Sequence, residues 1–165
     1  MNRFKYILLL LVLPVLTFAQ ESKLSVFDNL VGKTWIANGS WGNGAEFKQE
    51  IEFNFDLEGT IVTAKSKGFV DQKQTKLGSR NLGIRKFDAE SKQIKFWEFD
   101  VFGGVTEGIV ILDGDNILYQ YDYGGTLVTD MWEYVNDSEY NFKVGSYING
   151  KWEQIFLNTK FVLKQ

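Results

Sequence analysis

Residues 47–65, FKQEIEFNFDLEGTIVTAK, carry the clearest signal of secondary structure in the chain. Its first half places apolar side chains on one side of a two-residue repeat, at Phe47, Ile51, Phe53 and Phe55. That repeat is typical of a β-strand with one buried face. Glu58-Gly59 supplies a turn, and Thr60–Lys67 follows as a second strand. Strands joined by so short a turn pair antiparallel, so the stretch predicts a β-hairpin.

The same repeat continues along the chain from Thr34. A looser stretch, Gly68–Ser79, follows the hairpin. Further strands are expected at Trp35–Trp41, Leu82–Phe87, Gln93–Val101, Thr106–Leu112, Ile117–Tyr123, Thr126–Val135, Tyr140–Tyr147 and Lys151–Leu163. Most breaks between them are short and rich in Gly, Asn and Asp. About ten strands at this spacing, with no helix between them, predict an antiparallel all-β domain.

Consecutive hairpins without a long crossover favour an up-and-down β-barrel, because closing the sheet removes its exposed edges. A two-sheet sandwich is the alternative. Before the strands, apolar residues recur at helical spacing over residues 20–31, and Gly32 supplies a stop. The expected fold is therefore an antiparallel β-barrel of about ten strands preceded by a short helix.

The N-terminus has the pattern of a signal peptide. Arg3 and Lys5 precede an apolar run, Tyr6–Leu16, and Thr17 and Ala19 place small residues before a cleavage point. The run is too short for a membrane span. We therefore expect residues 1–19 to be removed and residues 20–165 to form one domain, periplasmic or secreted, with no stable membrane anchor after cleavage.

Composition excludes several classes of function. The 165-residue chain has no His and no Cys, so it has no disulfide, thiolate nucleophile, Ser-His-Asp triad or Cys-based zinc site. Without Arg3 and Lys5 the chain carries 16 basic and 21 acidic residues, a net charge of −5. This balance argues against a nucleic-acid partner, which requires concentrated positive charge. It leaves the oligomeric state open.

Short motifs in the strand order resemble the lipocalin-like barrels of exported bacterial proteins. They are Leu30-Val31-Gly32-Lys33-Thr34-Trp35, Arg85-Lys86-Phe87-Asp88, Trp132-Glu133-Tyr134 and Gly150-Lys151-Trp152. The resemblance implies a calycin-type barrel and a basic residue of the last strand, Lys160 or Lys164, packed over the first Trp. Related haem-binding barrels use a His ligand, which this chain lacks, so no haem or other cofactor is implied.

Arg85 is the candidate polar anchor for a ligand. An arginine that faces a barrel interior needs a carboxylate or a ligand anion to offset its desolvation, and Glu98, Asp130 and Glu133 are the candidate partners. The alternative is a salt bridge at the surface or rim, which contributes little to stability.

Aromatic side chains are numerous enough to line a cavity for a hydrophobic or aromatic molecule. The predicted ligand-binding residues are Trp41, Arg85, Trp97, Phe99, Tyr119, Tyr121, Asp130, Trp132 and Tyr134. The alternative is that the aromatics fill the core. A filled barrel would instead serve contacts with a protein or a glycan.

Two further hypotheses concern catalysis and metal binding. A buried Asp130 or Glu98 could act as a base and Tyr121 or Tyr134 as an acid, in a cofactor-free isomerase or lyase. The stretch Asp113–Asn116 lacks the ligand spacing of a calcium loop and is predicted to be a hairpin turn, so no metal site is expected.

Overall fold

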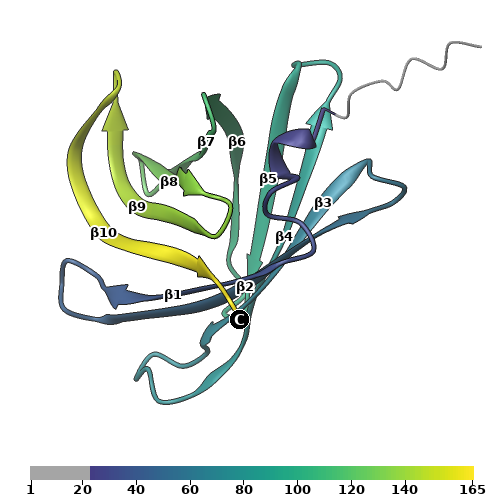
Figure 1. Ribbon diagram of the computed structural model, residues 1–165. Coiled ribbons are helices and arrows are strands. Elements are labelled where there is room, and N and C mark those ends of the chain that lie inside the picture. The colour runs from purple at the N-terminus through teal and green to yellow at the C-terminus, as the bar shows by residue number, and fades with distance from the viewer. Residues whose placement is uncertain (1–22) are drawn as a thin grey trace, which may run out of the picture.

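The computed structural model describes residues 23–165, which form a closed antiparallel β-barrel (Figure 1). They begin with a single 3-10 turn, η1 (Ser25–Phe27). The ten strands that follow are β1 (Thr34–Ser40), β2 (Glu46–Asp56), β3 (Ile61–Phe69), β4 (Leu77–Asp88), β5 (Gln93–Asp100), β6 (Val105–Asp113), β7 (Asn116–Tyr123), β8 (Thr126–Asn136), β9 (Glu139–Ile148) and β10 (Lys151–Leu163). Each strand pairs with its sequence neighbours, and β1 pairs with β10. The predicted up-and-down barrel is confirmed, and the sandwich alternative is wrong.

Two sequence-based boundaries need correction. Strand β4 begins at Leu77 rather than Leu82, so the loose stretch shrinks to residues 70–76. The helix predicted over residues 20–31 is reduced, within the described residues, to η1. The apolar spacing there has another cause, because Leu24, Phe27 and Leu30 are all buried against the barrel core. The predicted signal peptide, residues 1–19, lies outside the described residues.

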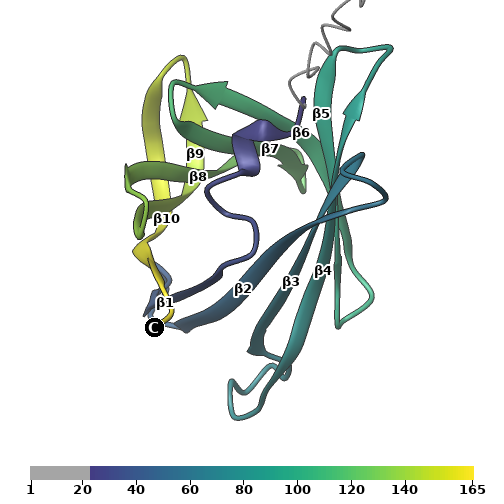
Figure 2. The same cartoon turned by 45° about the vertical axis from the view of Figure 1, so that its right-hand side comes forward.

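The chain around η1 closes one end of the barrel. Figure 2 shows it lying within the ring of strands, while the β3–β4 loop projects at the opposite end. Trp35 at the start of β1 is fully buried and donates from Nε1 to the carbonyl of Leu30 at 3.2 Å. Lys33 lies over the Trp35 ring at 5.7 Å, so the basic residue above the first Trp is neither Lys160 nor Lys164.

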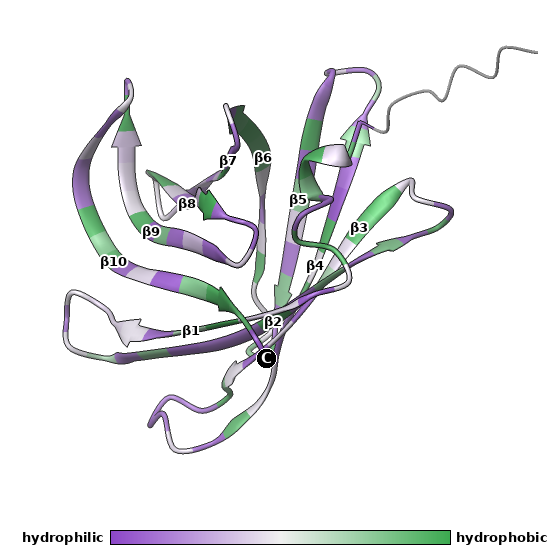
Figure 3. Ribbon diagram, in the orientation of Figure 1, coloured by the Kyte–Doolittle hydropathy of each residue, from purple (hydrophilic) through white to green (hydrophobic). Residues whose placement is uncertain are grey.

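An aromatic stack fills the interior behind this plug. Trp132 and Phe161 stack with their ring centroids 4.2 Å apart, and Trp132 also meets Phe53 and Tyr140 edge-on. Phe142 continues the stack towards the other end. The bands of hydrophobic and hydrophilic residues that alternate along the strands in Figure 3 reflect the two faces of the sheet.

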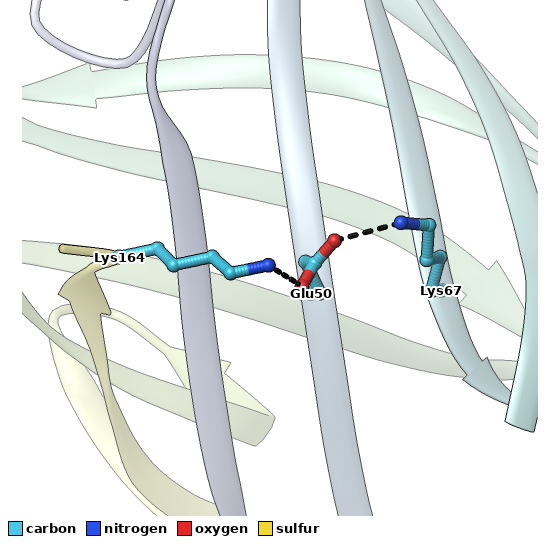
Figure 4. Close-up of polar contacts among 3 residues, drawn as sticks. All are labelled: Glu50, Lys67 and Lys164. Carbon is cyan, nitrogen blue, oxygen red and sulfur yellow. Dashed lines mark hydrogen bonds and ion pairs between the residues drawn. The ribbon is translucent and has the colours of Figure 1, made fainter.

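The seam between β1 and β10 closes the barrel. The two strands pair at Trp35 with Leu163 and at Ile36 with Val162. On the outer face, Lys164 reaches past β1 to Glu50 on β2 at 2.6 Å, and Glu50 also pairs with Lys67 on β3 at 2.9 Å (Figure 4). The two lysines lower the pKa of Glu50. This triad connects the last segment of the chain with the first hairpin.

The tight hairpins follow from residues that tolerate positive φ. Gly124-Gly125 joins β7 to β8 with φ of 61° and 82°, and Asn149-Gly150 joins β9 to β10 with φ of 51° and 79°. Two-residue turns with both φ positive match the right-handed twist of the flanking strands. The stretch Asp113–Asn116 is likewise a hairpin turn between β6 and β7, as predicted.

We expect Phe161→Ala to destabilise the fold by about 3–5 kcal/mol, because it removes a fully buried ring from the aromatic stack and leaves a cavity. Urea denaturation measures the change. Phe99→Ala is the matched control, since Phe99 is 43% exposed, and we expect it to cost less than about 1 kcal/mol. Equal losses in the two variants would contradict the assignment of Phe161 to the core.

Candidate functional site

The end of the barrel opposite η1 holds a cavity of about 450 Å³, which we call the mouth cavity. Its apolar walls come from the residue that follows β1, from β2, β3 and β9, and from the β5–β6 turn: Trp41, Phe47, Phe69, Phe142, Val144 and Phe102. Trp41 and Phe47 meet edge to face at 5.7 Å. The strands leave this end hollow, because the aromatic stack occupies the end closed by η1.

The β3–β4 loop, residues 70–76, forms one wall of the mouth cavity. Asp71 organises the loop by accepting hydrogen bonds from the backbone N–H of Thr75 and Lys76. Gln74 donates to the carbonyl of Glu46 at 2.7 Å and accepts from the Glu46 N–H at 3.1 Å. These two bonds join the loop to the start of β2. Asp71, Gln72 and Gln74 of this loop line the cavity. Lys73 and Lys76 of the same loop do not.

A second, smaller cavity of about 110 Å³, which we call the inner chamber, lies deeper in the barrel. Four residues line both cavities: Gln49 on β2, Asn81 on β4, Asp130 on β8 and Phe142 on β9. We call this group the throat. The buried Oδ1 of Asn81 has no hydrogen-bond partner among the described residues. The throat therefore joins an aromatic mouth to a polar inner chamber.

The inner chamber contains an ion pair between the buried Arg85 and the part-buried Glu98. Arg85 is 3% exposed, so the surface or rim salt bridge weighed from the sequence is wrong. Its Nη2 bonds to Glu98 Oε1, and its Nε donates to the Tyr119 hydroxyl at 3.2 Å. Burial opposes the charge of Arg85, but Tyr119 and Glu98 outweigh it and raise its pKa. A methyl group on Gly83 would overlap Arg85 Nη1, so the missing side chain at Gly83 makes room for the pair.

Asp130 is the second carboxylate of the interior, and no cation among the described residues forms an ion pair with it. It accepts a hydrogen bond from the Tyr121 hydroxyl at 3.0 Å. The pKa of Asp130 is raised to about 7, chiefly by burial and in smaller part by the charge of Glu98, while Tyr121 and Arg85 act in the opposite direction. Burial and Asp130 raise the pKa of Tyr121, so its hydroxyl remains the donor. Asp130 therefore gains or loses its proton near neutral pH.

Six of the nine predicted ligand-binding residues line the mouth cavity or the inner chamber, or contact a residue that does. Trp41 lines the mouth, Asp130 the throat, and Arg85, Tyr119 and Trp132 the inner chamber, while Tyr121 bonds to Asp130. Of the candidate partners of Arg85, Glu98 is the one that pairs with it. Glu133 instead pairs with Lys143.

The other three predicted residues lie elsewhere. Trp97 donates to Glu107 in an exposed contact, and Phe99 is 43% exposed, because on β5 the inward positions belong to Phe96 and Glu98. Tyr134 lies near the closed end, where its hydroxyl donates to Asp137 at 2.9 Å. At that end Tyr134 is far from Asp130 and Glu98, so it is not placed to act as the acid beside either carboxylate.

Sequence reasoning missed several lining residues. Gln49 interrupts the apolar face of β2 between Phe47 and Ile51, and that interruption was the available signal for a polar position inside the barrel. Arg80 lies at the rim, where its guanidinium stacks over Phe102 at 4.5 Å and donates to the carbonyl of Phe69. No sequence pattern singled out Phe102, because it sits in a turn.

Comparison of the sequence with known protein families gave no matching family model. Comparison with curated proteins likewise gave no match. Within residues 23–165, none of the helical segments has the length and apolar character to cross a bilayer. In the same residues, no three His, Cys, Asp or Glu side chains gather as metal ligands would.

We expect Asp130→Asn to stabilise the protein relative to the parent at pH 8, and less so at pH 5. The folded protein holds the proton of Asp130 up to about pH 7, whereas the unfolded chain releases it near the ordinary value of 3.8. The parent therefore loses stability as the pH rises between these values, and the variant does not. The difference between the two should grow by about 2 kcal/mol from pH 5 to pH 8, measured by urea denaturation.

Asp115→Asn, which removes an exposed carboxylate from the β6–β7 turn, is the control for net charge. Its stability should follow that of the parent at each pH. An effect of Asp130→Asn that is constant with pH would contradict the assignment of Asp130 as a group with a raised pKa.

Proposed function

We propose that the chain is an exported, lipocalin-like protein that binds a small hydrophobic or aromatic molecule in the mouth cavity. The observation that carries this proposal is the cavity of about 450 Å³, whose lining combines aromatic rings with polar side chains, among them Asn81 and Asp130. Ligand pockets in proteins have volumes of about 300–1,000 Å³, mostly apolar walls and a few oriented polar groups. The N-terminal signal pattern supports export, and the Gly32-to-Trp35 motif before a closed barrel supports the lipocalin-like family.

The cost of the interior polar groups also supports a binding role. A core built for stability alone would bury apolar side chains where this barrel places Arg85, Glu98 and Asp130. Asn81 Oδ1 and Arg85 Nη1 are buried without hydrogen-bond partners among the described residues. Proteins keep such costly groups where function requires them. Asn81 and Asp130 line the mouth cavity, and Arg85 and Glu98 line the smaller cavity beyond it, so a ligand that enters the mouth would meet Asn81 and Asp130 first.

One observation favours a second candidate, a cofactor-free isomerase or lyase. Asp130, with a pKa of about 7, accepts a hydrogen bond from Tyr121, and this arrangement suits a general base with a neighbouring acid. Such an enzyme would lose turnover in Asp130→Asn while still binding its substrate. Unchanged turnover in that variant would exclude Asp130 as the base.

Binding can be tested with the neutral dye N-phenyl-1-naphthylamine, whose fluorescence rises in apolar surroundings. We expect the dye to bind the protein lacking residues 1–19 at micromolar concentration. Ala45→Trp, which fills the mouth cavity from its rim, should weaken the binding at least about ten-fold, because the bulky ring occupies the space the dye needs.

Ala89→Trp is the matched control, because Ala89 is exposed in the β4–β5 turn at the closed end of the barrel. It should bind the dye like the parent. Equal binding by the parent and both variants would place the dye outside the mouth cavity and contradict the proposal. Native mass spectrometry of protein purified from its own host should in addition show a retained small molecule.

A further inference from the structure

The throat presents oxygen acceptors to whatever enters it from the mouth. Asp130 offers a carboxylate with one hydrogen bond from Tyr121, and Asn81 offers a buried Oδ1 with no partner among the described residues. Gln49 adds a side-chain amide, and Phe142 adds an aromatic ring. A positively charged group that donates several hydrogen bonds satisfies these oxygen acceptors. Such a cation also binds favourably to an aromatic face, here that of Phe142.

The charges of the interior point the same way. Arg85 is already neutralised by Glu98, with which it forms an ion pair. The groups that face Asp130 are Tyr119 and Tyr121 on β7, Glu98 on β5 and Arg85 on β4. Once Asp130 loses its proton, the chamber holds two carboxylates and one guanidinium, so it lacks one positive charge.

An anionic ligand does not suit this arrangement. In the inner chamber its charge would meet Glu98 and Asp130, and the guanidinium of Arg85 is held by Glu98 and Tyr119. The cations Lys48 and Arg80 line only the mouth cavity, where the carboxylates of Glu46 and Asp71 accompany them. Arg85 Nη1, although unpartnered, lies over Gly83 against the barrel wall. Arg85 is therefore better described as part of the fixed lining than as the anchor of a ligand carboxylate.

We propose that the throat binds the protonated amine of a small aromatic amine, with Asp130 as its counter-ion and the aromatic ring held in the mouth by Trp41, Phe47 and Phe142. This inference rests on the proposed binding function and names its ligand class. The ammonium group donates to Asp130 and to Asn81 Oδ1, and so satisfies the buried acceptor that the protein leaves unpaired. The ring lies among the aromatic pairs of the mouth, where Phe47 meets Trp41 edge to face and stacks with Phe142.

The binding is linked to protons. An ammonium binds the ionised form of Asp130, so binding releases the proton that Asp130 holds below pH 7. Affinity should therefore be about ten-fold weaker at pH 6 than at pH 8, because about a tenth of Asp130 is ionised at the lower pH. The amine keeps its own charge throughout this range.

The test compares three probes with similar bodies and different heads: 2-phenylethylamine, 2-phenylethanol and 3-phenylpropanoate. Calorimetry on the protein lacking residues 1–19 at pH 8 should show the amine binding at least about ten-fold more tightly than the alcohol, and the carboxylate binding most weakly. Asp130→Asn should reduce amine affinity at least about ten-fold and leave alcohol affinity within about two-fold of the parent. Asp115→Asn, with the same change in net charge, should bind all three probes as the parent does.

The contrary results are separable from failure of the proposed function. Equal binding of the amine and the alcohol, or tighter binding of the carboxylate, would overturn the amine assignment while the naphthylamine dye still reported a binding cavity. Dye binding that 2-phenylethylamine at millimolar concentration does not displace would overturn it as well. Absence of binding by the dye and all three probes would overturn both proposals. Loss of amine binding in Asp130→Asn is interpreted on protein whose folding the urea measurements have established.

Discussion

The rest of the structure depends on the closure of the sheet between β1 and β10. Trp35 pairs with Leu163 and Ile36 with Val162, and this pairing converts a meander of hairpins into a ring with an inside. Once the ring is closed, every second side chain must find a place within it. The largest of these belong to β1, β2, β8, β9 and β10, and they gather with Leu24, Phe27 and Leu30 at one end. That end becomes solid, and the seam is secured on the outside by the triad of Lys164, Glu50 and Lys67.

The same closure explains why the opposite end is hollow and polar. A ring of this width has more interior than its aromatic side chains fill, and the remaining inward positions carry Gln49, Asn81, Glu98 and Asp130. Glycine at position 83 leaves the space that lets the guanidinium of Arg85 lie flat against the wall beside Glu98. One end of the barrel is thus filled by apolar side chains that stabilise the fold, and the other end holds the two cavities and the polar side chains that line them.

Within the hollow half, the contrast between the two carboxylates carries the functional argument. Glu98 has a cationic partner and completes the Arg85 network. Asp130 has a hydroxyl partner but no cation among the described residues, and burial shifts its pKa towards neutrality. An interior charge without its counter-ion costs stability, and we propose that a ligand entering at the junction of the two cavities supplies the missing partner.

The strand order and the antiparallel topology could be predicted from the sequence, because alternation with a period of two and short Gly/Asn turns are local signals that follow directly from backbone geometry. The sequence also identified Arg85, Asp130 and four aromatic residues that line the cavities or contact their lining: Trp41, Tyr119, Tyr121 and Trp132. It did not determine which face of β5 points inward, and so it misplaced Trp97 and Phe99, because a strand with bulky residues on both faces gives no local preference. It overestimated the helix before β1, where the apolar residues are spaced to plug the barrel end. The pairing of Arg85 with Glu98, the isolation of Asp130 and the extent of the hollow became visible only in three dimensions. The pairing depends on the register of β4 with β5, and the other two depend on side chains that strands far apart in the chain bring together across the barrel.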